Sequence, residues 1–249
     1  MSVGFALDYL KGPPNPASER TFFSVVLFGA TMRLDHRLIL ALDVVEPEAA
    51  MSVAKAVRGE VDAIKVGWAL FLSGGRDIFR DLARFGYLLA DLRTAEIPNT
   101  TRLIVEQVAQ MGASGIITQG FVGEDSVRAA VESAGRAEVF VITEMSHPGG
   151  AEFTAPHAEE MARLAVRAGA AGIVAPATRP ERVKRLREIV GTKLILAPGV
   201  GAQGGKPAEA IRAGADAVIV GRSIYESKDP RASAEAIARE IRRSRGEAF

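Results

Sequence analysis

The sequence contains no cysteine, so disulfide bonds, thiol catalysis and cysteine-ligated metals are all excluded. Histidine is also scarce: only His36, His147 and His157 occur, and their separation shows no metal-ligand spacing. We therefore expect no zinc site of the usual kind.

Neither sign of charge is in excess. Lysine and arginine total 31, aspartate and glutamate total 30, and the formal net charge is +1. Proteins with a general nucleic-acid-binding or membrane-binding surface usually carry a basic excess. The balance argues against both kinds of partner, but it leaves room for a local basic pocket.

A long hydrophobic run is missing as well. Phe22–Ala30 (FFSVVLFGA) is apolar but far shorter than the roughly 20 residues that a membrane helix needs. As a signal peptide it would have Phe28 where a small residue belongs. We expect residues 1–31 to form an N-terminal extension, Met32 to open one domain of residues 32–249, and the protein to be cytoplasmic.

From Leu34 onward the sequence alternates between two patterns. Short, apolar, β-branched runs are separated by stretches with helical spacing, as expected when parallel strands are covered on both faces. The predicted strands are Leu38–Asp43, Ala63–Val66, Tyr87–Leu92, Gly115–Gln119, Val139–Glu144, Gly172–Ala175, Leu194–Ala197 and Ala217–Val220. The predicted helices include Thr100–Met111, Glu159–Ala168, Pro180–Val190 and Ala208–Ala213.

A weak internal repeat accompanies this alternation. Met111–Gly115, Arg167–Gly172 and Arg212–Ala217 each close a helix before a strand, where glycine fits a helix C-cap. Eight strand–helix units in about 210 residues are typical of a single (β/α)8 TIM barrel. The competing fold, an open doubly wound sheet, normally has about five or six strands. The strand count therefore favours the barrel.

Polar residues follow several of the apolar strands, at the end where a barrel builds its site. Because an unpaired buried charge is costly, these groups should pair with each other or with a ligand. The alternative is a salt-bridged rim without chemistry. The polar residues at these strand ends are Asp43, Lys65, Asp91, Arg93, Glu96, Glu144 and Ser146.

Two glycine-rich segments follow the seventh and eighth predicted strands. They are Ala197–Gly205 (APGVGAQGG) and Val220–Tyr225 (VGRSIY). Glycines allow backbone N–H groups to approach an anion, and many barrels bind phosphate at these two loops. Arg222 adds a fork of donors that matches phosphate oxygens. The alternative, glycines needed only for tight turns, is less favoured because both loops carry the pattern.

Four segments resemble the archaeal type of orotidine 5'-monophosphate decarboxylase. They are Glu144–Gly149 (EMSHPG), Arg179–Val190, Pro198–Gly205 and Ala215–Tyr225, and the similarity runs from about Leu38 to Tyr225. The resemblance implies a homodimeric (β/α)8 enzyme that uses no cofactor or metal. It would convert orotidine 5'-monophosphate (OMP) to uridine 5'-monophosphate (UMP) and carbon dioxide in pyrimidine synthesis.

The resemblance also implies roles for individual residues. Asp43 and Lys65 would hold the ribose, and Ser146 would contact the pyrimidine. Thr100 would reach into the partner's site. Gln203, Gly221 and Arg222 would hold the phosphate, and Pro198 would also bind the substrate.

The chain departs from the family at the centre of the site. The family pattern Asp-x-Lys-x-x-Asp is here Asp91, Arg93 and Glu96, so the alternating charge signs with Lys65 are kept. In the family, the lysine protonates the carbon left by carbon dioxide, and the final aspartate comes from the other subunit. Arginine, with a pKa above about 12, is a poor proton donor. Catalysis by Lys65, Asp91, Arg93 and Glu96 is therefore expected to be impaired.

Two other functions stay open at this stage. One is a nucleotide-binding homologue that has lost turnover, and the other is a sugar-phosphate lyase of the same superfamily. Ser146 and Gln203 favour a nucleotide ligand over a sugar phosphate. The arginines of residues 182–187, flanked by Glu181 and Glu188, are expected to form a solvated helix face.

Overall fold

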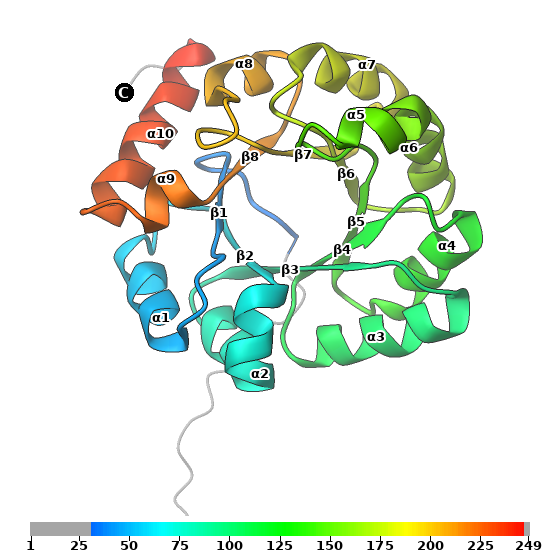
Figure 1. Cartoon of the computed structure of the whole chain (residues 1–249), viewed down its shortest axis with the longest axis horizontal. Coiled ribbons are helices and arrows are strands. Elements are labelled where there is room, and N and C mark those ends of the chain that lie inside the picture. The colour runs from blue at the N-terminus through cyan, green and yellow to red at the C-terminus, as the bar shows by residue number, and fades with distance from the viewer. Residues whose placement is uncertain (1–30, 247–249) are drawn as a thin grey trace, which may run out of the picture.

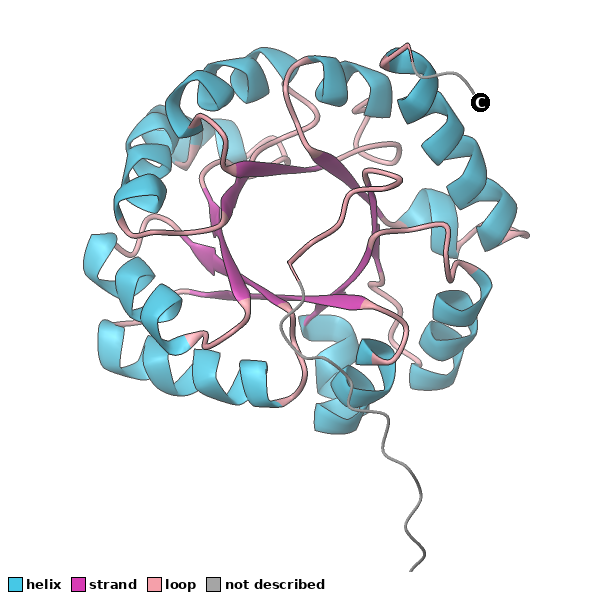
Figure 2. Cartoon of the chain, turned by 180° about the vertical axis from the view of Figure 1, so that it is seen from behind, coloured by secondary structure: helices cyan, strands magenta, loops and turns pink. Residues whose placement is uncertain are grey.

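The computed structural model describes residues 31–246, so the interpretation of residues 1–30 as part of an extension lies outside the described residues. Eight parallel strands pair in sequential order and close into a barrel, with the helices around it (Figures 1 and 2). The strands are β1 (Leu38–Ala41), β2 (Ala63–Gly67), β3 (Tyr87–Thr94), β4 (Gly115–Gln119), β5 (Glu138–Ile142), β6 (Gly172–Val174), β7 (Leu194–Pro198) and β8 (Ala217–Val220). The predicted (β/α)8 barrel is confirmed.

Helices follow the strands and form the outer ring (Figure 1). They are α1 (Pro47–Ala56), α2 (Trp68–Ala83), α3 (Pro98–Gln110), α4 (Glu124–Ser133), α5 (Gly150–Phe153), the 3-10 helix η1 (Ala155–His157), α6 (Ala158–Arg167), α7 (Pro180–Val190), α8 (Pro207–Arg212), α9 (Arg222–Tyr225) and α10 (Pro230–Ser244). No helix of the described residues is long and apolar enough to cross a membrane.

All eight predicted strands are present, with small shifts at their ends. β4 and β8 match their predicted bounds, whereas β3 continues to Thr94 and β5 ends at Ile142. β1 ends at Ala41, so Asp43 lies just past the strand, and Glu144 likewise lies in the loop after β5. Polar groups at these places are free to face the barrel mouth.

Alternate residues of each strand pack on opposite sides of the barrel wall. In β1, Leu38 and Leu40 pack outward against the helices, whereas Ile39 and Ala41 face the barrel interior. The interior is filled by apolar side chains from every strand, including Phe140 of β5. The barrel is therefore a packed core that leaves space only at its ends.

Met32 belongs to the interior cluster at the amino end of the barrel. Its side chain is 6% exposed, and its backbone N–H donates to Glu138 Oε2 over 3.0 Å. The Tyr87 hydroxyl donates to the same oxygen over 2.9 Å. Burial and the neighbouring Glu138 raise the pKa of Tyr87, so the hydroxyl keeps its proton as the donor.

Candidate active site

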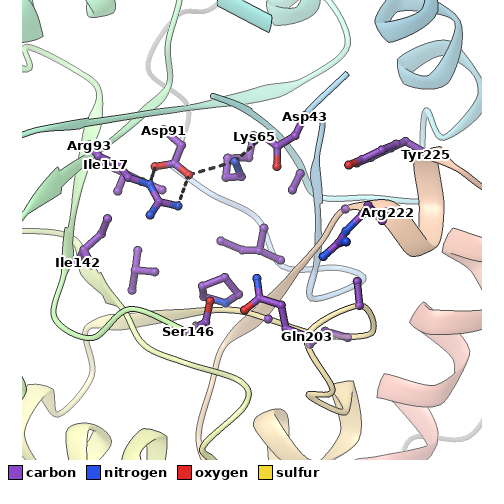
Figure 3. A pocket seen from close by; sticks show the side chains of 18 residues that line it. Asp43, Lys65, Asp91, Arg93, Ile117, Ile142, Ser146, Gln203, Arg222 and Tyr225 are labelled. Atoms are coloured by element: carbon purple, nitrogen blue, oxygen red, sulfur yellow. Dashed lines mark hydrogen bonds and ion pairs between the residues drawn. The ribbon is translucent and has the colours of Figure 1, made fainter. Parts of the chain in front are cut away.

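A pocket opens at the carboxyl ends of the strands, where the sequence predicts a site (Figure 3). Its polar and charged lining residues are Asp43, Lys65, Asp91, Arg93, Ser146, Gln203, Arg222 and Tyr225. Pro198 and Gly221 also line it. The structure thus brings together nine residues predicted from the sequence, from strands or loops of both halves of the barrel. Within residues 31–246, no group of three histidine or acidic side chains is arranged to hold a metal ion.

A row of alternating charges forms one side of the pocket (Figure 3). Lys65 Nζ lies 3.2 Å from Asp43 Oδ1 and 3.1 Å from Asp91 Oδ2. Arg93 Nε lies 3.2 Å from Asp91 Oδ1, and its Nη2 lies 3.3 Å from Asp91 Oδ2. Asp91 is therefore held between two cations.

Burial and charge act in opposite directions on the central pair. Burial alone would lower the pKa of Lys65, but the negative charges of Asp91 and Asp43 outweigh it and raise that pKa. Burial would raise the pKa of Asp91, yet Lys65 and Arg93 lower it below its ordinary value. Both groups are consequently charged near neutral pH.

The backbone at Arg93 adopts an uncommon conformation. Its φ is 48°, in the left-handed region that non-glycine residues rarely enter. The pairing of β3 with β4 also shifts register between Ala90 and Thr94. Arg93 lies within this irregular stretch and extends its Nη1 to 3.4 Å from the sulfur of Met145. Such backbone strain persists where the surroundings impose it, often at functional sites.

The other end of the pocket carries Gln203 and Arg222. Figure 3 shows the Arg222 guanidinium turned toward the pocket beside Tyr225, near the Asp43 end of the charged row and away from Arg93. Within residues 31–246, it donates no hydrogen bond and forms no ion pair. Gly201, at φ 73°, has a backbone conformation that other residues rarely adopt, and a Cβ there would meet Ser223 Oγ unless that hydroxyl turned away. A glycine-lined loop beside an unpaired guanidinium suits an anion.

Ser146 is placed by a buried ion cluster behind the pocket. Glu144 is fully buried, with its two carboxylate oxygens 2.7 Å from Arg179 Nε and 2.8 Å from Arg182 Nε. The Thr178 hydroxyl donates to the Ser146 carbonyl over 3.0 Å. The loops after β5 and β6 are thereby joined beneath Ser146.

The solvated helix face predicted for residues 182–187 is only partly right. Arg185 is half exposed and pairs with surface glutamates on α6 and α7. Arg182 instead turns inward to Glu144, and Arg187 pairs with Asp216 below β8. The pattern of flanking glutamates could not reveal a carboxylate that approaches from another loop.

Glu96 and Thr100, both expected at the site, do not line the pocket of this chain. The Glu96 side chain is exposed, in the turn between β3 and α3, and neither residue lines the cavity. Thr100 lies in the first turn of α3. The row of alternating charges in this chain therefore consists of Asp43, Lys65, Asp91 and Arg93. Glu96, the fourth member of the predicted row that begins at Lys65, is not part of it.

Some lining residues were not among the predicted site residues. Tyr225 ends the segment VGRSIY, three positions after Arg222, and a helical reading of that segment places both on one side. Ile117, Ile142, Val174 and Ile219 form the apolar wall. Ile117 and Ile142 face inward by strand alternation, a signal that exists in the sequence but is shared by every interior residue.

Comparison with known proteins shows the family to which this chain belongs. A sequence model described as "Orotidine 5'-phosphate decarboxylase / HUMPS family" matches residues 36–237. Orotidine 5'-phosphate decarboxylase of Methanosarcina mazei is 58% identical over 207 residues, which cover 82% of this chain and 94% of that protein. The enzyme of Thermococcus kodakarensis is 47% identical over 210 residues, 83% of this chain and 97% of that protein.

Solved structures agree with the sequence comparison. Orotidine 5'-monophosphate decarboxylase of Methanocaldococcus jannaschii, in complex with the inhibitor BMP, superposes with a TM-score of 0.78 at 40% identity, covering 82% of this chain and 97% of that one. The Pyrococcus horikoshii enzyme gives a TM-score of 0.77 at 46% identity, covering 82% and 99%. The chain therefore belongs to the orotidine 5'-phosphate decarboxylase family.

Proposed function

We propose that the protein decarboxylates OMP to UMP, using its own side chains without a cofactor. The observation that carries this proposal is the pairing of two features in one pocket. A row of alternating charges runs along one side as far as Arg93. Away from Arg93 lie a glycine-rich loop and Arg222, whose guanidinium has no partner within residues 31–246. OMP carries a carboxylate at its reacting carbon and a phosphate at its far end, so both ends of the pocket have a partner.

The charged row would drive the chemistry electrostatically. Asp91 would face the substrate carboxylate, and the carbon–carbon bond to that carboxylate breaks with its electron pair left on the pyrimidine ring. Lys65 and Arg93 would stabilise the developing carbanion more than the ground state, which is what lowers a barrier. A proton must then reach that carbon to give UMP. Arg93 stands at the family's donor position, but its guanidinium gives up a proton reluctantly.

The remaining residues would bind the substrate along the pocket. Asp43 and Lys65 suit the ribose hydroxyls, and Ser146 suits a polar edge of the pyrimidine. The phosphate would meet Pro198, Gln203, Gly221 and Arg222. Contacts so far from the reacting carbon can contribute binding energy that closes loops over the site.

We infer further that two subunits share their active sites. Glu96 and Thr100 do not line the pocket of their own chain, which suits residues that complete the pocket of a partner. The same sector exposes large apolar side chains, an arrangement typical of an interface. They are Trp68 (50% exposed), Leu72 (75%), Ile97 (66%) and Leu103 (57%), on α2, α3 and the turn before α3.

A subunit-mixing experiment tests the shared site. The Lys65→Ala and Glu96→Ala variants should each be inactive. Mixed dimers should regain one intact site, with Lys65 from one chain and Glu96 from the other. No recovery after proven subunit exchange would place Glu96 outside the partner's site.

One observation favours a second candidate, a nucleotide-binding protein without turnover. Two nitrogens of the Arg93 guanidinium donate to Asp91. Arg93 therefore keeps the positive charge of the family's lysine beside Asp91, but it is a weaker proton donor than that lysine. Such a site would still bind OMP. We place either activity in the cytoplasm, with the other steps of nucleotide synthesis.

Loss of OMP absorbance on adding the purified protein, beside a titration with a non-reactive nucleotide analogue, separates these functions. Turnover with binding supports the decarboxylase, and binding without turnover supports the second candidate. Binding of neither nucleotide would contradict both.

A further inference from the structure

Residues 93–97, which form the end of β3 and the turn before α3, carry two groups in different surroundings. Arg93 lines the pocket of its own subunit, whereas the Glu96 side chain is exposed and does not line that pocket. Only two residues separate them along the chain. Any change in the path of this turn would therefore displace both groups together.

Three buried hydroxyl groups hold the backbone of this turn. Thr118 Oγ1 donates to the Thr94 carbonyl over 2.9 Å. Thr101 Oγ1 and Ser126 Oγ both donate to the Glu96 carbonyl, over 3.0 Å and 2.8 Å. The three hydroxyls come from β4, α3 and α4, and their residues are only 1–2% exposed.

Ser126 lies in the first turn of α4, where no preceding helical turn offers a carbonyl, and its hydroxyl donates to another element. Serine within a helix commonly donates to a carbonyl of its own preceding turn. Ser133, on the same helix α4, does so to the Ala129 carbonyl over 2.6 Å. Ser126 instead reaches 30 positions back along the chain, to Glu96. It therefore ties α4 to the turn rather than serving its own helix.

The backbone of residues 93–97 begins in a strained conformation. Arg93 occupies an uncommon left-handed conformation, and the strand pairing beside it is irregular. A conformation of this kind persists only where surrounding contacts impose it. The Glu96 carbonyl uses both of its lone pairs on the two hydroxyls, which fixes the direction of that carbonyl and the path of the backbone from which the side chain extends.

We propose that Thr101, Ser126 and Thr118 form a hydroxyl clamp that positions catalytic groups for two active sites at once. Thr101 and Ser126 aim Glu96 at the partner's site, and Thr118 steadies Arg93 in its own. The proposal rests on the shared-site decarboxylase proposed above. None of the three residues lines the pocket, so they act as positioning residues and not as substrate contacts.

The first test compares hydroxyl removal with hydroxyl retention. Thr101→Val and Ser126→Ala should each lower kcat about 10- to 100-fold while KM changes little, because misplacement by about 1 Å can cost that much. Thr101→Ser, which keeps the hydroxyl, should restore most of the rate. Ser133→Ala removes a hydroxyl from the same helix and should leave kcat unchanged. Equal losses for Ser126→Ala and Ser133→Ala would overturn the proposal.

Mixed dimers, purified through two different affinity tags, give the sharper test. In the first arrangement one chain carries Ser126→Ala and the other carries Lys65→Ala. Only the site of the first chain has Lys65, and it receives Glu96 from the second chain, whose clamp is intact. The rate at that site should match that of a parent site. In the second arrangement one chain carries both changes and its partner is a parent chain. Only the site of the parent chain has Lys65, and it receives Glu96 from the chain with the loosened clamp, so it should be slow. Thr118→Val should show the opposite pattern, because Arg93 acts in its own subunit. Equal rates in the two arrangements would contradict the clamp.

Failure of the clamp can be told apart from failure of the proposed function. If Lys65→Ala and Glu96→Ala chains do not complement each other, the shared site is wrong. Amide hydrogen exchange of residues 94–97 then still tests the clamp without turnover. Faster exchange in Ser126→Ala, with α4 otherwise unchanged, supports it. Unchanged exchange at residues 94–97 overturns it.

Discussion

The Arg93 guanidinium lies against the Asp91 carboxylate with two contacts, Nε to Oδ1 at 3.2 Å and Nη2 to Oδ2 at 3.3 Å. A planar fork held in this way keeps its charge and its position, because both oxygens of the partner are engaged. The same geometry offers little to proton transfer. Binding and turnover in this site can therefore be separated experimentally.

Arg222 provides the first prediction. Arg222→Ala should weaken nucleotide binding by roughly 2–4 kcal/mol, because a charge-assisted contact to the phosphate is lost. The free nucleoside should be affected far less. Titration calorimetry with both ligands measures this difference.

A control variant for this measurement lies on α7. Arg185→Ala also removes an arginine, but one that pairs with surface glutamates far from the pocket lining, so nucleotide affinity should not change. Equal losses for nucleoside and nucleotide in Arg222→Ala would show that Arg222 does not bind the phosphate.

Lys65 gives a prediction about pH. Burial lowers its pKa, but Asp91 and Asp43 outweigh that effect, so the folded-state pKa is above the unfolded value. The ion pairs are then complete below the unfolded pKa of about 10.4 and are lost only as pH rises through the higher folded value. The affinity ratio of parent to Lys65→Met for a non-reactive nucleotide should be constant from about pH 7 to 9.5. A ratio that collapses near pH 8 would mean that Lys65 loses its proton early.

The barrel and most of the pocket could be predicted from the sequence because each depends on a local signal. Apolar runs and glycine-closed helices mark the strand–helix units, and polar residues at strand ends mark the mouth. Pro180–Val190 and Gly115–Gln119 have the same bounds in sequence and structure. Lys65 and Asp91 line the pocket as predicted, because strand alternation in β2 and β3 determines where they point.

Contacts between distant loops could not be predicted in the same way. The burial of Glu144 between Arg179 and Arg182 depends on how the loops after β5 and β6 meet, which no periodicity encodes. The left-handed backbone at Arg93 and the three hydroxyls around the turn are also products of tertiary packing. Threonine and serine on helices give the same sequence signal whether they donate within the helix or across to another element.

Met32 provides a prediction about the domain boundary. A chain that begins at Met32 should fold and bind nucleotide like the full chain, because Met32 packs in the barrel interior and its backbone contacts Glu138. A chain that begins at Asp35 lacks this contact and should melt at a lower temperature. Thermal unfolding of the three chains measures the difference. A large drop for the chain that begins at Met32 would show that residues 1–31 contribute to the fold.

The most direct measurement is single-turnover decarboxylation of OMP by the parent chain, by Arg93→Lys, by Glu96→Asp and by the double variant. The parent should bind nucleotide well and turn over slowly, since charge signs are kept while the proton donor is weak. The double variant should be faster by at least about 100-fold, roughly 2.7 kcal/mol of barrier. Neither single change should suffice, because adjoining residues that have adjusted to each other are rarely additive. A parent that is already fast, and that slows when Arg93 becomes lysine, would contradict this account.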